Sequence, residues 1–178
     1  MHIEYECRIL EIKKEKFISK LESLGAIKKG EYEQKRFVYD FNPAIPSKWI
    51  RLRTNGKKTT LTIKEVADNT TASGTKELEV EVSSFDDTNK ILNELGYIPR
   101  NYQENNRITY TLDDVEIDID SWPLIPTYVE IEGKDEESIN KLLKKLKIDQ
   151  KDVTTLDVTS IYNEIYNIDV LNIKDLRF

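Results

Sequence analysis

Residues 77–81 read Glu-Leu-Glu-Val-Glu, so that every second side chain is a carboxylate and the side chains between them are apolar. A period of two is the period of a β-strand, which predicts a strand with its carboxylates on one face and its apolar side chains on the other. Three further stretches have the same pattern: Glu4-Tyr-Glu6, Glu116-Ile-Asp118-Ile-Asp120 and Glu130-Ile-Glu132. We therefore expect a sheet with one charged face whose groups are sorted by sign.

Basic side chains follow the same alternation in two other stretches, Arg51-Leu-Arg53 and Leu61-Thr-Ile-Lys64. Carboxylates that lie opposite one another across a sheet repel, so a cluster of acids beside a cluster of cations becomes favourable when a ligand bridges them. Hard divalent cations bind carboxylate oxygens, and phosphate oxygens bind Arg and Lys. A polyphosphate that carries divalent cations would bridge both clusters, so we expect the function on the charged face.

The composition is that of an ordinary globular protein. The chain has 178 residues, of which 34% are charged and 38% hydrophobic, and we expect a single domain over residues 1–178. Its net charge of -6 argues against binding to nucleic acid or to an anionic membrane, because both require a basic surface. No apolar run approaches the roughly 20 residues that span a bilayer, and the N-terminus has no signal core, so we expect a cytoplasmic protein.

Two residue types are too scarce for several kinds of catalytic site. His2 is the only histidine and Cys7 the only cysteine. A multi-histidine zinc site is therefore excluded, and a Ser-His-Asp triad would need His2 at the very N-terminus. Cys7 lies on the apolar face of the first predicted strand, where a buried structural thiol is the expected role.

Periodicity and turn residues divide the chain into strands and helices. The dipeptide Asn55-Gly56 separates two alternating stretches, which we expect to pair as an antiparallel hairpin. Ser84 is a candidate helix N-cap and Gly96 a candidate helix end. The predicted strands span residues 2–10, 32–41, 48–54, 58–66, 75–83, 102–112, 115–121 and 127–133. The predicted amphipathic helices span residues 13–25, 86–95 and 135–147, and a short helix is predicted at 159–167.

This order of elements favours an α+β fold in which eight mostly antiparallel strands close into a β-barrel. Closure removes the exposed strand edges. A charged sheet face can also simply face water, which is the common arrangement for a single strand. Here three amphipathic helices can cover the apolar face from outside, which places the charged face inside the barrel as a polar tunnel. The tail, residues 155–178, is a candidate cover for one mouth of this tunnel.

The charged motifs, taken in order, resemble the pattern of the CYTH superfamily, also called triphosphate tunnel metalloenzymes. They are Glu4-Tyr-Glu6 with Arg8, Trp49-Ile-Arg-Leu-Arg53, Leu61-Thr-Ile-Lys64, Lys76-Glu-Leu-Glu79, Arg107, Asp118-Ile-Asp120 and Glu130-Ile-Glu132-Gly-Lys134. The chain looks most similar to the bacterial CyaB-like branch; the superfamily includes class IV adenylyl cyclases and thiamine triphosphatases. The opening signature of the family is Glu-x-Glu-x-Lys. Arg8 stands in the place of that lysine, which keeps the positive charge and changes its shape and reach.

The resemblance implies a role for each group of charged residues. It implies Mg²⁺ or Mn²⁺ as cofactor, and oxygen-only ligands suit these ions. The implied metal ligands are Glu4, Glu6, Glu77, Glu79, Asp118, Asp120, Glu130 and Glu132. The implied triphosphate-binding residues are Arg8, Arg51, Arg53, Lys64, Arg107 and, at the rim, Lys134, with Arg8, Lys64 and Asp118 as the catalytic candidates. Arg36 is in reach by strand count and is not included in this set.

Three functions fit this pattern. Hydrolysis of an inorganic or organic triphosphate is the first hypothesis, because nothing in the sequence clearly recognises a nucleobase. The alternatives are a class IV adenylyl cyclase, which converts ATP to cyclic AMP and pyrophosphate, and a non-catalytic binder of a phosphorylated ligand. The expected partner is a small-molecule triphosphate such as ATP, tripolyphosphate or thiamine triphosphate. A homodimer is implied only by analogy with the cyclase members of the family.

Overall fold

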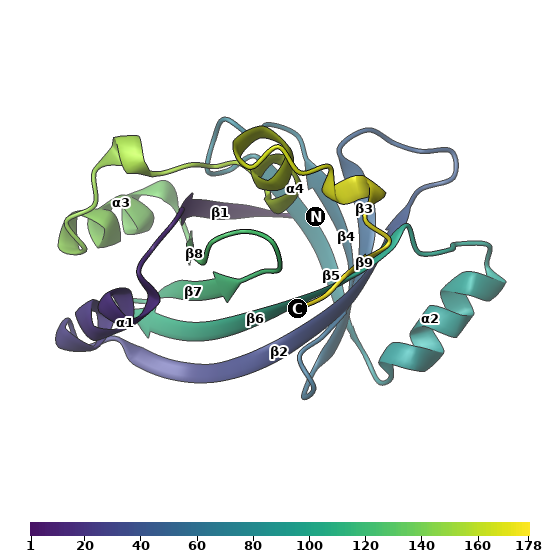
Figure 1. The fold of residues 1–178 in the computed structure, drawn as a ribbon, viewed down its shortest axis with the longest axis horizontal. Coiled ribbons are helices and arrows are strands. Elements are labelled where there is room, and N and C mark those ends of the chain that lie inside the picture. Colours follow the sequence, from purple (N-terminus) through teal and green to yellow (C-terminus); the bar gives the residue numbers. More distant parts are fainter.

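Eight strands of the protein close into a barrel. In the computed structural model, which describes residues 1–178, they are β1 (His2–Ile9), β2 (Ile27–Asp40), β3 (Lys48–Thr54), β4 (Thr59–Val66), β5 (Thr75–Val82), β6 (Asn101–Leu112), β7 (Val115–Ser121) and β8 (Tyr128–Gly133). Neighbouring strands follow the order β2-β3-β4-β5-β1-β8-β7-β6, and β6 pairs back onto β2 (Figure 1). All eight pairings are antiparallel. The predicted α+β fold with a closed barrel is therefore confirmed.

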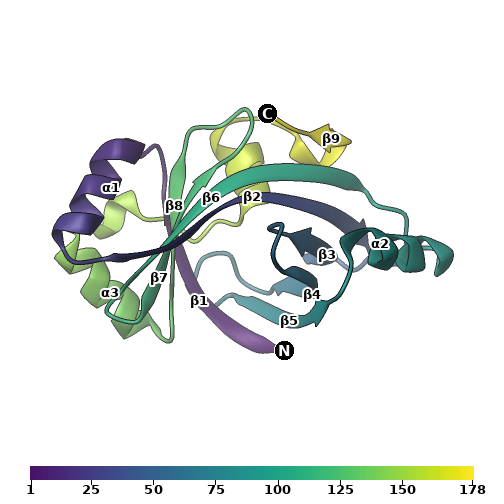
Figure 2. The same cartoon turned by 90° about the horizontal axis from the view of Figure 1, so that it is seen from below.

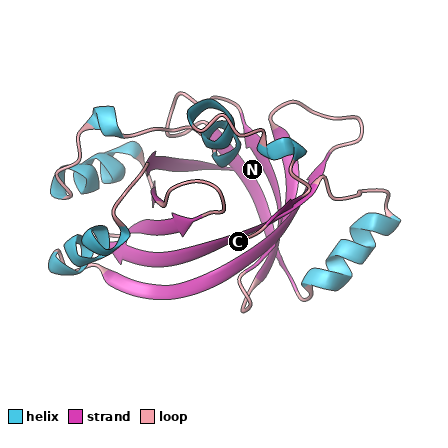
Figure 3. Cartoon of the chain, viewed as in Figure 1, coloured by secondary structure: helices cyan, strands magenta, loops and turns pink.

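The longer helices of the protein pack on the outside of this barrel (Figure 3). Helices α1 (Lys14–Ser23) and α3 (Glu136–Lys145) lie next to each other at one end of the molecule, and α2 (Phe85–Glu94) lies at the other end (Figure 2). The side chain of Ser84 caps α2 by accepting a hydrogen bond from the backbone N–H of Asp87, as predicted. No helix of the protein combines the length and the apolar character that crossing a membrane requires.

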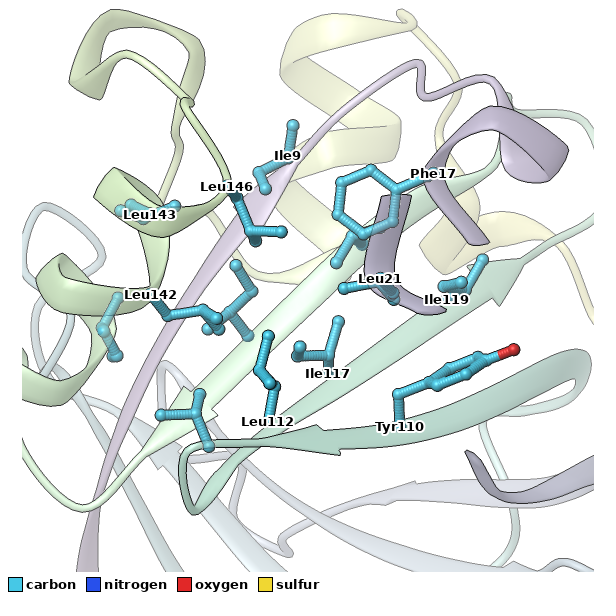
Figure 4. Packing of buried hydrophobic residues seen from close by; sticks show 14 of the residues in the cluster. Ile9, Phe17, Leu21, Tyr110, Leu112, Ile117, Ile119, Leu142, Leu143 and Leu146 are labelled. Carbon is cyan, nitrogen blue, oxygen red and sulfur yellow. The ribbon is translucent and has the colours of Figure 1, made fainter. Parts of the chain in front are cut away.

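The main apolar core lies between the barrel wall and two of the helices. Ile117 of β7 belongs to one buried cluster with Leu142 of α3 and Leu21 of α1 (Figure 4). Ile131 of β8 belongs to the same cluster. Burial of each such side chain contributes about 1.5–3 kcal/mol. Cys7 is buried in the same cluster, which confirms its predicted burial. Because this core lies outside the barrel, the inner face is left for polar groups.

The turn between β3 and β4 shows how the sequence sets the register of the barrel. Gly56 has a φ of +81°, a conformation that glycine adopts without strain. The side-chain oxygen of Asn55 accepts hydrogen bonds from the backbone N–H groups of Lys57 (3.0 Å) and Lys58 (2.8 Å). The strands then pair Arg51 with Thr62, which confirms the predicted hairpin.

The tail after α3 runs back along the barrel. It forms a single α-helical turn, α4 (Val158–Ser160), followed by a π-helical turn at Ile161–Ile165, so the predicted helix at 159–167 forms only in part. The side chain of Asp157 caps this turn. A ninth strand, β9 (Asp175–Leu176), was not predicted and pairs in parallel with β6. The tail is anchored by apolar contacts of Tyr162, Val170 and Leu176 with Trp122 and Tyr128.

Strand β2 is longer than the sequence predicts. The prediction began at residue 32, whereas the strand begins at Ile27 and pairs with β6 from there onward. The register shifts between Lys28 and Gly30, which marks a bulge. Residues 28–30 read Lys-Lys-Gly and show no alternation, so the periodicity gave no signal for this end of the strand.

Candidate active site

Charged side chains meet inside the barrel because the strand register aligns them. Lys64 lies opposite Glu77, Arg107 opposite Asp120, and Arg8 opposite Glu130. Since alternate residues of a strand point to the same face, the neighbours two positions away point inward as well. The lumen contains a cavity of about 420 Å³, whose charged lining includes Arg8, Arg36, Arg51, Arg53, Lys64, Arg107 and Glu130. The structure thus brings together most of the predicted phosphate-binding residues.

Lys64 is the centre of one group of ion pairs. Its Nζ lies 2.7 Å from Oε1 of Glu77 and 3.2 Å from Oε2 of Glu4. Arg51 approaches the same Glu77 carboxylate at 3.3 Å. Burial alone would raise the pKa of Glu77, but Arg51 and Lys64 outweigh it and hold that pKa well below its usual range. Glu77 is therefore a carboxylate in the ligand-free protein, and it neutralises part of the cationic charge.

Arg107 is the centre of a second and tighter group. Its guanidinium contacts Oδ2 of Asp118 at 2.5 Å, Oδ2 of Asp120 at 2.6 Å and Oε1 of Glu130 at 3.1 Å. Its Nε also donates to Oδ1 of Asp120 at 2.9 Å, so the contact with Asp120 is bidentate. These carboxylates raise the pKa of Arg107 well above its usual value against the opposing effect of burial. Burial raises the pKa of Asp118 to about 7, although Arg107 opposes this.

Arg8 joins the lumen to the tail. Its Nη2 lies 2.8 Å from Oε2 of Glu6 and 2.5 Å from Oε2 of Glu130, and its Nη1 donates to the backbone carbonyl of Leu156 at 2.9 Å. The backbones of Arg8 and Thr154 also exchange two hydrogen bonds, of 2.7 and 2.9 Å. A lysine offers no planar fork with which to make all these contacts. The replacement of the family lysine by Arg8 therefore has a structural consequence, since the guanidinium adds a hydrogen bond to Leu156 beside the backbone pairing of Thr154 with β1.

Arg36 also faces the cavity, and the set of residues chosen from the sequence did not include it. Both of its side-chain hydrogen bonds come from Nη2 and go to neutral amides, those of Gln34 (2.9 Å) and Asn105. Its guanidinium carbon lies 4.5 Å from the centre of the Trp122 ring. Arg53, its neighbour across the strand pair, reaches only one carboxylate, that of Glu79, at 3.8 Å. This part of the lumen is therefore rich in positive charge that carboxylates do not balance.

The acidic residues of β1, β7 and β8 meet in a different part of the barrel. Glu132 pairs in register with both Glu6 and Glu116. Although water reaches Glu132, partial burial raises its pKa to about 8, and the repulsion of Glu4, Glu130 and Glu116 adds to that shift. Every charge that acts appreciably on Glu132 is thus another carboxylate.

The donors of this acidic group suit a hard divalent cation, because they are all carboxylate oxygens that repel one another. In the ligand-free arrangement no three of them converge closely enough to hold an ion. Glu4 is engaged by Lys64, and Glu6 by Arg8 and by the hydroxyl of Thr75 at 3.0 Å. The roles of the implied metal ligands therefore stay a prediction.

Lys134 lies apart from the rest of the predicted site, and Glu79 lies at its exposed edge. Lys134 follows the end of β8 and lines a separate pocket with Asp113 and Lys141, so the structure does not bring it to the cavity. The predicted alternation fails there because the strand ends at Gly133. Glu79 lies toward the rim, where it accepts a hydrogen bond from Thr62 at 2.8 Å and approaches Arg51 at 3.6 Å.

The other part of the same cavity is lined by apolar and aromatic side chains. They come from the loop between β2 and β3, from the strand ends and from the tail, and they are Val38, Ile45, Pro46, Trp49, Val66, Trp122, Val158, Tyr162, Val170 and Leu171. The tail therefore contributes lining residues. One cavity combines a cationic region with an apolar region.

Several buried hydrogen-bond donors of the residues that line this cavity have no acceptor within the protein. Six of the buried polar atoms that lack a partner belong to residues of the cavity lining, and each can donate: Nε of Arg8, Arg36, Arg51 and Arg100, Nε1 of Trp122 and the hydroxyl of Tyr128. Buried polar groups without a partner are rare in proteins. Their concentration among the residues of one cavity lining marks this cavity as the candidate ligand site.

Solved structures of other proteins share this fold. The Pyrococcus horikoshii protein PH1012 is 23% identical, with a TM-score of 0.75, over 87% of this chain and 96% of that one. A Vibrio parahaemolyticus protein provisionally named adenylate cyclase is 13% identical, with a TM-score of 0.73, over 91% of this chain and 98% of that one. The Hippeastrum protein HpAC1 is 15% identical, with a TM-score of 0.61, over 94% and 97% of the two chains. It is provisionally named an adenylyl cyclase and is described as having a dominant triphosphatase activity.

At these identities the likeness concerns the fold alone. No curated protein sequence matches the chain. The sequence profile of the CYTH domain, however, matches residues 2–159, which is most of the 178-residue chain and includes every strand of the barrel. The chain therefore belongs to the CYTH domain family.

Proposed function

We propose that this protein binds a triphosphate inside its barrel and hydrolyses it with the help of a divalent cation. The observation that carries the proposal is the set of buried donors without acceptors, which belong to the residues that line one cavity. A triphosphate has acceptor oxygens on each phosphorus, so it can satisfy several of these donors at once. Seven cations from five strands line the same cavity and supply the matching charge: Arg8, Arg36, Lys48, Arg51, Arg53, Lys64 and Arg107.

The existing ion pairs indicate which cations a phosphate can recruit. The contacts of Arg51 with Glu77 (3.3 Å) and Glu79 (3.6 Å) are long for hydrogen bonds. The contact of Arg53 with Glu79, at 3.8 Å, is longer still. Phosphate oxygens between these arginines would form shorter, bidentate contacts at little cost to the protein. Arg107, which is held by three carboxylates, is better suited to position the site than to move with the ligand.

Glu4, Glu6 and Glu132 would hold the divalent cation. A bound Mg²⁺ or Mn²⁺ would neutralise phosphoryl oxygens and polarise the terminal phosphorus. The protein would give the cation and the triphosphate separate binding sites. The carboxylates of β1 and β8 would bind the cation, while Arg51 and Lys64 would bind the oxygens of the anion. Lys64 lies 3.2 Å from Glu4, and the two binding sets are therefore adjacent.

In the proposed hydrolysis a water oxygen attacks the terminal phosphorus. The bond from that phosphorus to the bridging oxygen breaks, its electron pair stays on the leaving diphosphate, and one proton of the water passes to a carboxylate of the acidic group or to phosphate. Positioning and electrostatic stabilisation supply most of the rate in such reactions, and the cations Arg51, Arg53 and Lys64 provide the latter.

The apolar part of the cavity favours a second candidate, cyclisation of a nucleoside triphosphate. Trp49, Ile45 and Pro46 form a surface on which a base could lie, and an inorganic triphosphate would leave it unused. In that reaction the ribose 3'-hydroxyl attacks the α-phosphorus, and pyrophosphate leaves. An organic triphosphate that is hydrolysed would use the same surface.

A product-resolved assay tests the proposal. The protein is incubated with Mg²⁺ or Mn²⁺ and with tripolyphosphate, ATP or thiamine triphosphate, and the products are separated. Release of orthophosphate supports hydrolysis, whereas cyclic AMP with pyrophosphate supports cyclisation. Metal-dependent binding without any product after long incubation would reject both and identify a non-catalytic binder. Glu132→Gln is the matched variant, which we expect to bind the anion and to lose turnover.

A further inference from the structure

Arg36 differs from the other deeply buried cations of the barrel in having no anionic partner. Its exposed fraction is 6%, and its two hydrogen bonds go to the neutral amides of Gln34 and Asn105. Arg8 and Lys64 are buried to a similar degree, Arg107 is somewhat more exposed, and each of the three contacts at least two carboxylates within 3.2 Å. A buried cation without a counter-ion is costly to the folded state. The folded protein therefore carries an uncompensated buried charge at Arg36, which lowers its stability.

The surroundings of Arg36 add to this cost. Burial lowers the pKa of Arg36 well below its usual value, and the nearby charges of Arg53, Arg51 and Arg107 lower it further. Asp120 is the carboxylate that opposes them, and it is already held by the bidentate contact of Arg107. The protein therefore has no free carboxylate to offer Arg36.

Two features of Arg36 suit an incoming anion. Its Nε is buried without an acceptor although the residue lines the cavity, and the indole Nε1 of Trp122 is in the same situation. The face of the Trp122 ring lies 4.5 Å from the guanidinium carbon and limits the plane in which the guanidinium can lie. Trp122 is itself held by Tyr162 of the tail, with ring centres 6.3 Å apart. Such a stacked and oriented guanidinium is pre-organised for an oxyanion.

We propose that Arg36, held by Trp122, is the centre of an anion-binding subsite at the end of the tunnel lined by the tail, and that this subsite takes a phosphate group of the ligand. Strand β2 lies four places from β1 around the eight-stranded ring, so Arg36 occupies the wall opposite Glu4 and Glu6. The phosphate at Arg36 is therefore one that the acidic group does not reach. This inference rests on the proposed function, since it places one end of the bound polyphosphate at Arg36.

The test compares Arg36→Met with the wild-type protein in stability and in anion affinity. Methionine is an uncharged side chain of roughly similar shape in this position. Removal of a cation without a counter-ion should raise the melting temperature of the ligand-free protein, whereas a cation that serves only packing would lower it when removed. The affinity for inorganic tripolyphosphate, measured by calorimetry without turnover, should fall about tenfold or more. Lys90→Met is the matched control, because it removes one exposed positive charge of α2 and should change neither quantity.

The outcomes separate this inference from the proposed function. If tripolyphosphate binds the wild-type protein and Arg36→Met with equal affinity, the subsite is wrong and the proposed function stands. If neither protein binds it, both proposals fail. If Arg36→Met weakens binding and the wild-type protein releases no product, the subsite stands and hydrolysis is wrong.

A second variant and a fluorescence signal distinguish the loss of the subsite from misfolding of the variant. Arg36→Lys keeps the charge and loses the flat face, so it should fold and bind tripolyphosphate more weakly than the wild-type protein; equal affinity would overturn the subsite. Trp122 becomes the only tryptophan in Trp49→Phe, since the chain has two. Tripolyphosphate should then change its emission, and this change should disappear when Arg36→Met is added. An unchanged emission in Trp49→Phe on binding would place the anion away from Trp122 and overturn the proposal.

Discussion

Two regions of the barrel interior treat buried positive charge in opposite ways. Around Arg107 the charge is balanced within the protein, because three carboxylates surround one guanidinium. Around Arg36 and Arg53 it is not, because one cation has only neutral partners and the other has a single distant carboxylate. The first region is a framework that is complete without a ligand. The second is completed by a ligand, and substitutions in the two regions should therefore have opposite effects on stability.

The largest effect is expected at Arg107. Arg107→Met leaves Asp118, Asp120 and Glu130 without their shared cation in a buried site, which should destabilise the protein by about 3–5 kcal/mol. Urea unfolding of the ligand-free protein measures this change. A loss below about 1 kcal/mol would mean that the carboxylates simply take up protons, and the contrast with Arg36→Met would then disappear.

The next effect is stabilisation by the ligand itself. A ligand that binds only the folded state raises its stability by about 2.7 kcal/mol at a concentration of one hundred times Kd. Tripolyphosphate with Mn²⁺ should therefore raise the melting temperature by several degrees, and excess EDTA should reduce the rise. Sulfate at equal ionic strength is the control for general salt effects. A rise of the same size with sulfate would show that the cationic region does not recognise a polyphosphate.

The balanced region is also the region that the sequence predicts well. The alternation at Glu116-Ile-Asp118-Ile-Asp120 predicts both the strand and the inward carboxylates, and the apolar residues between them predict the outer core under α3. Arg107 is the only charged residue of its phase on β6, and its prediction came from the resemblance to the family. Local pattern is sufficient for β7 and β8, because each of these strands carries several carboxylates of one phase.

The unbalanced region could not be predicted in this way. On β2 the positions of this phase carry Gln34, Arg36, Val38 and Asp40, so no run of like charges marks the face. The distinctive property of Arg36 is the absence of a carboxylate beside it, which depends on the register of β2 with β3 and β6. The contact of Arg8 with Leu156 likewise joins residues that are 148 positions apart.

Arg8 gives a smaller effect that sharpens the comparison, because it belongs to the balanced region and also holds the tail. Arg8→Lys keeps the charge and loses the hydrogen bond to the carbonyl of Leu156, which should cost about 1 kcal/mol. Limited proteolysis should then cut near residues 154–160 faster than in the wild-type protein. We expect no gain of turnover, since the guanidinium is committed to Glu6 and Glu130. Faster turnover in Arg8→Lys would show that the family lysine has a catalytic role that Arg8 has lost.

The smallest effect concerns the pH dependence of the ligand-free protein. The folded-state pKa of Glu132 is raised to about 8, above the value of about 4.3 expected in the unfolded chain. A carboxyl group shifted upward binds its proton more tightly in the folded state, so its contribution to stability is complete below pH 4 and is lost as the pH rises through 8. The melting temperature in EDTA should therefore decline between pH 5 and 9.

Glu132→Gln isolates the contribution of this carboxyl group, because glutamine cannot lose a proton. The variant should show a flatter decline than the wild-type protein above pH 6. Glu81→Gln is the matched control, since Glu81 is exposed and lies 3.5 Å from Lys58 outside the acidic group. A decline in Glu132→Gln that runs parallel to the wild-type curve would assign the pH dependence to other groups, first to Asp118, whose pKa of about 7 has the same sign. In that case the pH dependence of the melting temperature would come from a carboxyl group of the balanced region around Arg107. The contrast between the two regions would then be weaker than the ion pairs indicate.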